Sequence, residues 1–179
     1  MRSIADLSTQ SAATAAAAFS SLPSHRAGAQ SASSVGRGYD FPESMLLMST
    51  TDKQGRITHC NQAFEQVSGF SKHDLMGQPH NIVRHPDVPS EIFKDLWATI
   101  GRGRMWQGTV KNARHGGGHY WVRAYVTPVL QAGKPIGYMS VRARASDQEI
   151  AEAQKLYADI VAQRSRAKPR FIQIGRAHV

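Results

Sequence analysis

Large apolar residues are concentrated between residues 41 and 144 of the chain and are scarce in residues 1–40. Within the central stretch, short runs of apolar and polar residues are separated by turns that contain glycine, such as Asp52–Gly55 and Gln131–Lys134. Runs of this length between glycine turns predict β-strands, because glycine supplies the positive φ that tight turns need. The expected strands are residues 45–50, 56–60, 106–111, 120–130 and 136–144.

Helical spacing replaces this pattern after the second expected strand. Asn61 stands where a helix N-cap belongs, and Phe64 and Val67 follow at helical spacing. Ser71 begins a second short helix, with Asp74 in the acidic position of a capping box. We therefore expect two short helices next to the first hairpin.

The next segment, residues 78–89, contains three prolines and predicts irregular backbone. Ser90 is expected to cap a firmer helix that ends at Gly101. A last helix begins at Asp147 and reaches about Gln163; its narrow apolar stripe predicts packing on the sheet or pairing with a partner helix. The earlier of these two helices, which begins at Ser90, has an apolar face made of Ile92, Phe93, Leu96, Trp97 and Ile100.

This order of elements predicts an α+β fold, a five-stranded antiparallel sheet with helices on one face and a pocket between the two layers. We expect residues 41–146 to form the folded domain and residues 147–166 a C-terminal helix. Residues 1–40, rich in Ala and Ser, predict a disordered extension, and residues 167–179 a tail. Because residues 174–179 match the translation of a common sequencing adapter, we expect the coding sequence to be cut short there.

The composition of the chain excludes several classes of function. The net charge is +9, but the basic residues are scattered singly, which favours solvated surface over a nucleic-acid site. A single cysteine, Cys60, excludes an intramolecular disulfide and a cysteine-cluster metal site. No window approaches the roughly 18–20 apolar residues of a membrane span. The chain contains no phosphate-binding loop, zinc-protease motif or nucleophile elbow, so we expect a sensing domain and not an enzyme.

Specific motifs strengthen this expectation. The most specific is the segment Asn81–Asp87 followed by Tyr120–Arg123, with further likeness through residues 47–157. In these segments the chain resembles the PAS domain of bacterial aerotaxis receptors. The resemblance implies a PAS fold with a C-terminal signalling helix, and a non-covalently bound FAD whose redox state reports on respiration or oxygen. It also implies a cytoplasmic PAS domain. Because the membrane-anchored signalling module of such receptors is not found in this sequence, the chain is either a fragment of a larger chemoreceptor or a stand-alone PAS protein.

Six residues are candidates for contact with that cofactor. Asn61 matches a family position that contributes to flavin binding, and a plain N-cap explains it equally well. Arg84, His85 and Asp87 lie in the proline-rich loop. An arginine there can neutralise a pyrophosphate or lie near the N1–C2=O edge of the flavin. The alternative for this loop is a local Arg–Asp pair within a turn.

The other two candidates come from the third expected strand. Trp106 matches a family tryptophan associated with the flavin site, where an indole can stack on the ring or wall it off. Asn112 can hydrogen-bond an amide edge of a ligand, or simply end its strand. From the apolar pattern alone Trp97, Trp121 and also Trp106 are interpreted as core residues.

Two other functions stay open. Four histidines, His59, His80, His85 and His119, leave a haem-based gas sensor possible, although without a Cys-x-x-Cys-His motif covalent haem is excluded. A ligand-free PAS module acting as a dimerisation surface is the second. A homodimer is expected for the FAD-binding sensor as well. Cys60 closes the second strand, away from the position of the reactive cysteine in light-sensing flavin domains, so no photochemical adduct is expected.

Overall fold

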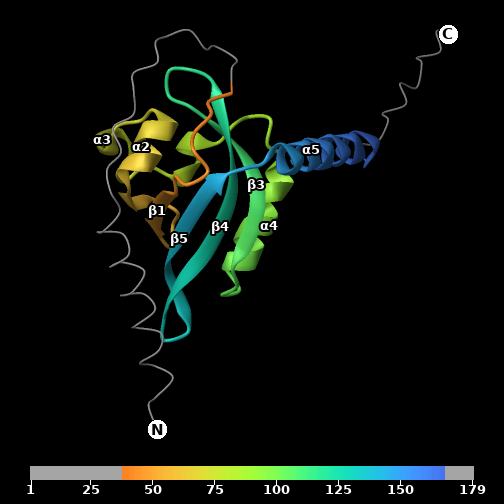
Figure 1. Cartoon of the computed structure of the whole chain (residues 1–179). Coiled ribbons are helices and arrows are strands. Elements are labelled where there is room, and N and C mark those ends of the chain that lie inside the picture. The colour runs from red at the N-terminus through yellow and green to blue at the C-terminus, as the bar shows by residue number, and fades with distance from the viewer. Residues whose placement is uncertain (1–37, 168–179) are drawn as a thin grey trace, which may run out of the picture.

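A computed structural model of the chain describes residues 38–167; the expectations for residues 1–37 and 168–179 lie outside the described residues. Five strands form one antiparallel sheet in the order β2-β1-β5-β4-β3, which confirms the predicted sheet (Figure 1). The strands are β1 Leu47–Asp52, β2 Ile57–Cys60, β3 Trp106–Ala113, β4 His119–Gln131 and β5 Lys134–Arg144.

Short helices cover one face of this sheet. They are α2 Gln62–Ser68, α3 Lys72–Leu75, the 3₁₀ helix η1 His80–Val83 and α4 Ser90–Ile100. Residues alternate along β4, so that Tyr120, Val122 and Ala124 are buried beneath the helices while Trp121 and Arg123 lie on the other face. The covered face carries the core of the domain.

The N-terminus of α4 differs from the prediction. Pro89, not Ser90, occupies the N-cap position, since its fixed φ of −58° already suits the extended conformation that an N-cap requires. Ser90 is the first helical residue, and its hydroxyl donates to the carboxylate of Glu91 at 3.3 Å.

The last helix, α5 Asp147–Ala167, runs away from the sheet past α4 (Figure 1). The Tyr157 hydroxyl donates to the Thr109 carbonyl at 2.9 Å, and its ring stacks on Trp121 with the centroids 6.0 Å apart. Trp121 is therefore not a residue of the core beneath the helices; it lies between the outer face of the sheet and α5. The predicted packing on the sheet is thus present, while Leu156 and Val161 remain exposed.

Asn61 joins the first strand to the first helix. Its Oδ1 accepts from the backbone N–H of Phe64, which confirms the predicted N-cap, and also from the N–H of Met48, both at 3.0 Å. Its Nδ2 donates to the Leu46 carbonyl at 2.9 Å. One side chain thus fixes the start of α2 against the start of β1.

We expect Asn61→Ala to destabilise the ligand-free domain by about 2–3 kcal/mol, because it removes an N-cap and leaves two further backbone groups without partners. Asn61→Asp keeps the acceptor and should cost about 1 kcal/mol. Urea denaturation measures both. An Asn61→Ala domain as stable as the wild type would show that this side chain serves some purpose other than the junction.

Candidate functional site

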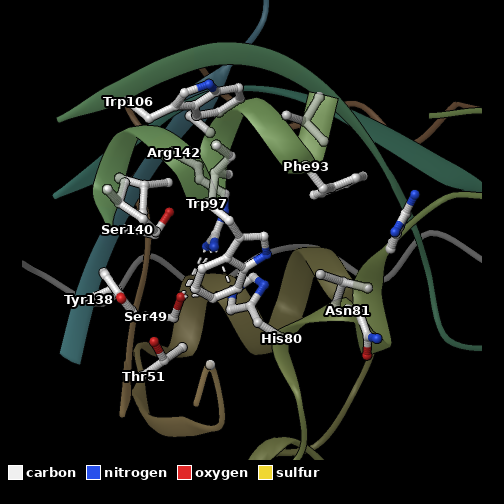
Figure 2. A pocket seen from close by; sticks show the side chains of 18 of the residues that line it. Ser49, Thr51, His80, Asn81, Phe93, Trp97, Trp106, Tyr138, Ser140 and Arg142 are labelled. Atoms are coloured by element: carbon white, nitrogen blue, oxygen red, sulfur yellow. Dashed lines mark hydrogen bonds between the residues drawn. The ribbon is translucent and has the colours of Figure 1, made fainter. Parts of the chain in front are cut away.

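A cavity of about 260 Å³ lies between the helical layer and the covered face of the sheet (Figure 2). Its floor comes from β3, β4 and β5, and its roof from η1 and α4. Most of the wall is apolar, as is usual for a small-molecule site. The apolar and aromatic lining residues are Pro79, Val83, Phe93, Leu96, Trp97, Ile100, Trp106, Val110, Val122, Ala124, Val126 and Tyr138.

A polar cluster of Arg142, His80 and Ser49 interrupts this apolar wall (Figure 2). Arg142 Nη2 donates to His80 Nε2 at 2.6 Å, and both terminal nitrogens of Arg142 donate to Ser49 Oγ at 3.2 and 3.3 Å. Ser49 Oγ lies 3.1 Å from His80 Nε2. Because a guanidinium can only donate, the Nε2 atom of His80 must be an acceptor and carry no proton.

Burial and the neighbouring positive charge of Arg142 lower the pKa of His80 to about 3, so His80 is neutral at physiological pH. Burial also lowers the pKa of Arg142, to about 10, which leaves the guanidinium charged at neutral pH. The cluster therefore carries one net positive charge, located on Arg142.

That charge has no acidic partner among residues 38–167: the ion pairs of this region do not include Arg142, which is only 5% exposed. One face of the guanidinium lies 5.1 Å from the ring centre of Phe64. The buried Ser140 Oγ, two residues earlier on β5, has no hydrogen-bond partner within the described range. Buried charges and hydroxyls are normally paired, so both groups point to a ligand with acceptor atoms.

Three of the six predicted site residues line the cavity, namely Arg84, Trp106 and Asn112. The backbone of Arg84 pairs with that of Asn112, and its guanidinium stacks 4.0 Å from the centre of the Phe93 ring. Asn112 is 5% exposed. Arg84 and Asn112 are brought side by side by this backbone pairing, whereas Trp106 lies six residues earlier on β3.

The Trp106 indole is held in place from two sides. Its Nε1 donates to Asp95 Oδ2 of α4 at 2.8 Å. On the same face of β3, a Cβ atom at Gly108 would overlap the indole ring, so only glycine leaves room for the ring at that position. Trp106 is therefore a fixed wall of the cavity.

The other three candidates do not line the cavity. Asn61 uses its amide in the junction described above, and His85 and Asp87 point to a surface cluster with Lys111. Lys111 Nζ lies 2.6 Å from Asp87 Oδ2 and this hydrogen bond lowers the pKa of Asp87. The acid in this loop thus pairs with Lys111, not with Arg84. A ligand contact for Asn61, His85 or Asp87 stays a prediction, and each already has a protein partner.

Arg142 and Ser49 were absent from the predicted site, and so was His80 except as a haem candidate. The signal was available on β5, where Tyr138, Ser140 and Arg142 recur at every second position of a strand whose covered face meets the helices. Trp97 corrects the prediction in another way: it lines the cavity and is 44% exposed, although Ile100, less than one turn further along α4, is buried in the core.

Comparison with known proteins supports a sensory domain. Residues 57–142 match the family described as PAS fold. The aerotaxis receptor of Escherichia coli strain K12 is 54% identical over 119 residues, which cover 66% of this chain and 24% of that receptor. The nitrogen fixation regulatory protein of Klebsiella pneumoniae is 32% identical over 88 residues, 49% of this chain and 18% of that protein. The chain thus spans about a quarter or less of the length of these relatives.

Solved structures agree on the fold. A PAS domain from Colwellia psychrerythraea superposes with a TM-score of 0.53 at 22% identity, covering 56% of this chain and 86% of that one. The LOV domain of the blue-light photoreceptor Aureochrome1 gives 0.54 at 17% identity, covering 65% of this chain and 91% of that one. The five-stranded sheet, its helical cover and the match to the receptor agree with one another. The described part of this chain is therefore a PAS sensor domain of the aerotaxis receptor family, a domain of signal transduction.

Proposed function

We propose that this domain binds FAD without a covalent link and senses redox state or oxygen through it. The observation that carries the proposal is the buried charge of Arg142, which has no acidic partner among residues 38–167, in the wall of a mostly apolar cavity. The relationship to a protein named aerotaxis receptor supports it. Structures that resemble the fold include light-oxygen-voltage domains, one of them studied with a flavin analogue.

The cavity fits the chemistry of a flavin ring, which has an apolar end and a polar pyrimidine edge. Trp106 and Phe93 offer flat or apolar wall for the ring. Asn112 and Ser140 can hydrogen-bond the polar edge, and Arg142 can neutralise negative charge there. These five residues are the ones we assign to holding the cofactor.

Bound FAD would supply electron-transfer chemistry, and its reduction changes the charge of the ring. Arg142 is the group of the polar cluster that responds to such a change, because it is the charged member of the cluster. His80 and Ser49 hold the guanidinium in position through their hydrogen bonds. A stronger pull on Arg142 from the ligand would weaken these bonds and displace β5.

β5 leads directly into α5, so this displacement has a short route out of the domain. Arg142 lies two residues before the end of the strand at Arg144, and α5 begins at Asp147. The first turn of α5 is tied to the sheet by an ion pair of 2.8 Å between Arg123 and Glu149. We infer that the position of α5 is the output of the sensor.

The proteins that would receive the signal from α5 remain predictions. A second copy of this chain or a receptor signalling module would meet α5 at its exposed Leu156 and Val161. Between residues 38 and 167 no helix is long and apolar enough to span a membrane. The cytoplasmic location and the attachment to a larger chemoreceptor are proposed from the relationship to the aerotaxis receptor.

The haem alternative has one observation against it. His80 is the histidine that lines the cavity within the described range, and its Nε2 atom already accepts from Arg142. An absorption spectrum of the purified protein separates the three functions. The two-band spectrum of oxidised flavin supports the proposal, a Soret band supports haem, and a spectrum without either supports the ligand-free module.

We expect Arg142→Met to lower flavin affinity at least tenfold, because hydrogen bonds to a charged group contribute about 1.5–3 kcal/mol. Arg123→Met is the matched control, since that arginine lies on the outer face of the sheet. Titration of flavin into stripped protein measures both affinities. Equal flavin binding by wild type and Arg142→Met would exclude the role assigned to Arg142.

The neutral state of His80 predicts a pH dependence of stability. Histidine in an unfolded chain has a pKa of about 6.5, whereas that of His80 in the folded domain is lowered to about 3. Between these values only the unfolded chain gains the proton, so stability falls as the pH falls from about 6.5. We expect the unfolding free energy of the wild type to fall more steeply than that of His80→Gln between pH 6 and pH 5. The difference between the two slopes should be up to about 1.4 kcal/mol per pH unit. Parallel pH profiles from urea denaturation would contradict this.

A further inference from the structure

The cavity opens on one side, and the exposure of its lining residues identifies that side. The buried ones include Val110, Asn112, Val122 and Ser140, all from the sheet. The exposed lining residues come from other elements, and they lie together around one rim, which we call the mouth. They are Gln54, Pro79, Asn81 and Trp97.

Trp97 forms the α4 side of the mouth. The six-membered edge of its indole lies against the backbone of Gly55 in the β1–β2 turn, where an added Cβ atom would be 3.0 Å from Cη2. On the other side it meets Tyr138 of β5 edge-on, with ring centroids 5.4 Å apart. Figure 2 shows this indole among the side chains that line the cavity. The ring is thus fixed in orientation, yet 44% of the residue remains exposed to solvent.

An exposed and fixed aromatic ring at a cavity mouth suits a ligand larger than the cavity. Pockets that enclose drug-sized molecules measure about 300–1,000 Å³, and this one measures about 260 Å³. A ring system fits inside, whereas a dinucleotide must leave part of its length outside. The outer part then passes over the mouth residues.

The charges at the mouth suit a phosphate-bearing segment. The backbone of Arg56 pairs with that of Pro79, and its guanidinium donates to the Gly77 carbonyl at 3.2 Å, which places this cation beside the rim. Lys53 is exposed in the same turn. The nearby carboxylate of Asp52 accepts from two backbone N–H groups of its own turn, both at 2.9 Å.

We propose that Trp97 is the stacking platform for the adenine of a flavin dinucleotide, and that it makes the domain select FAD over FMN. This inference rests on the proposed flavin function and adds the subsite for the adenosine half. A nucleic-acid base gains affinity on an aromatic ring because every base has a flat face, and such a contact changes affinity about tenfold or more. Trp97 is then a specificity residue, distinct from the groups that hold the ring.

The test compares FAD and FMN binding to flavin-stripped protein by flavin fluorescence. We expect the wild type to bind FAD about tenfold or more tightly than FMN. Trp97→Leu keeps an apolar cover over the mouth but lacks a flat face, so it should bind both flavins with nearly equal affinity and FMN about as tightly as the wild type does. Trp97→Phe, which retains a ring, should keep part of the preference for FAD.

The outcomes separate the two proposals. An unchanged ratio of FAD to FMN affinity in Trp97→Leu, in a protein that binds both, overturns the assignment of Trp97 and leaves the flavin function standing. A wild type that binds neither flavin overturns both. Thermal melts of each variant show whether it is folded, and since Trp97 is half-exposed we expect both to fold. If Trp97→Leu melts early, Trp97→Ala decides: an FAD-to-FMN affinity ratio equal to that of the wild type in a folded Trp97→Ala protein excludes stacking.

Discussion

Arg142 places a positive charge inside the domain, held by Ser49 and His80, without a carboxylate in ion-pair contact among residues 38–167. Removing a charge from water costs several kcal/mol unless a counter-charge or strong acceptors replace the lost hydration. The neutral hydrogen bonds of Ser49 and His80 replace only part of it. The remainder makes the cavity selective for a ligand with negative charge or acceptor atoms. Burial, and secondly the charge of Arg142, lower the pKa of His80 and keep it neutral.

The sheet explains how such a charge comes to lie there. In the antiparallel register Leu47 of β1 faces Arg142 of β5, and Ser49 faces Ser140, so the polar side chains of two neighbouring strands project to the same side. The helices between β2 and β3 then close over that side. Since β5 also leads into α5, the strand that carries the charged group is the strand that connects to the exit from the domain.

Much of the fold could be predicted from sequence because it depends on local signals. The strands follow glycine turns and alternation, and Asn61 and Ser71 mark helix starts by their own side chains. Ser90 was misplaced by one position because Pro89 takes the N-cap position through its backbone conformation, without a side-chain hydrogen bond. The inward Arg84, Trp106 and Asn112 were found through resemblance, since no local pattern distinguishes a cavity wall from a core.

The centre of the site was missed for a physical reason. Arg142 and His80 are 62 positions apart and meet only when β5 packs beneath η1. An arginine in a strand is normally assigned to the solvent face, and only the inward parity of β5 contradicts that assignment. For Trp97 the error was the opposite one. Its helical spacing predicted burial, whereas the indole is 44% exposed and lines the cavity while Ile100 of the same helix is buried.

The unfolding free energy of the flavin-free domain tests the central claim, that Arg142 is a buried charge left for a ligand to compensate. Urea denaturation should find flavin-free Arg142→Met as stable as the wild type or more stable. The methionine removes the desolvation cost, and Ser49 and His80 can still bond to each other at 3.1 Å. A loss of several kcal/mol in Arg142→Met would show instead that the protein itself compensates the charge, and would contradict the account.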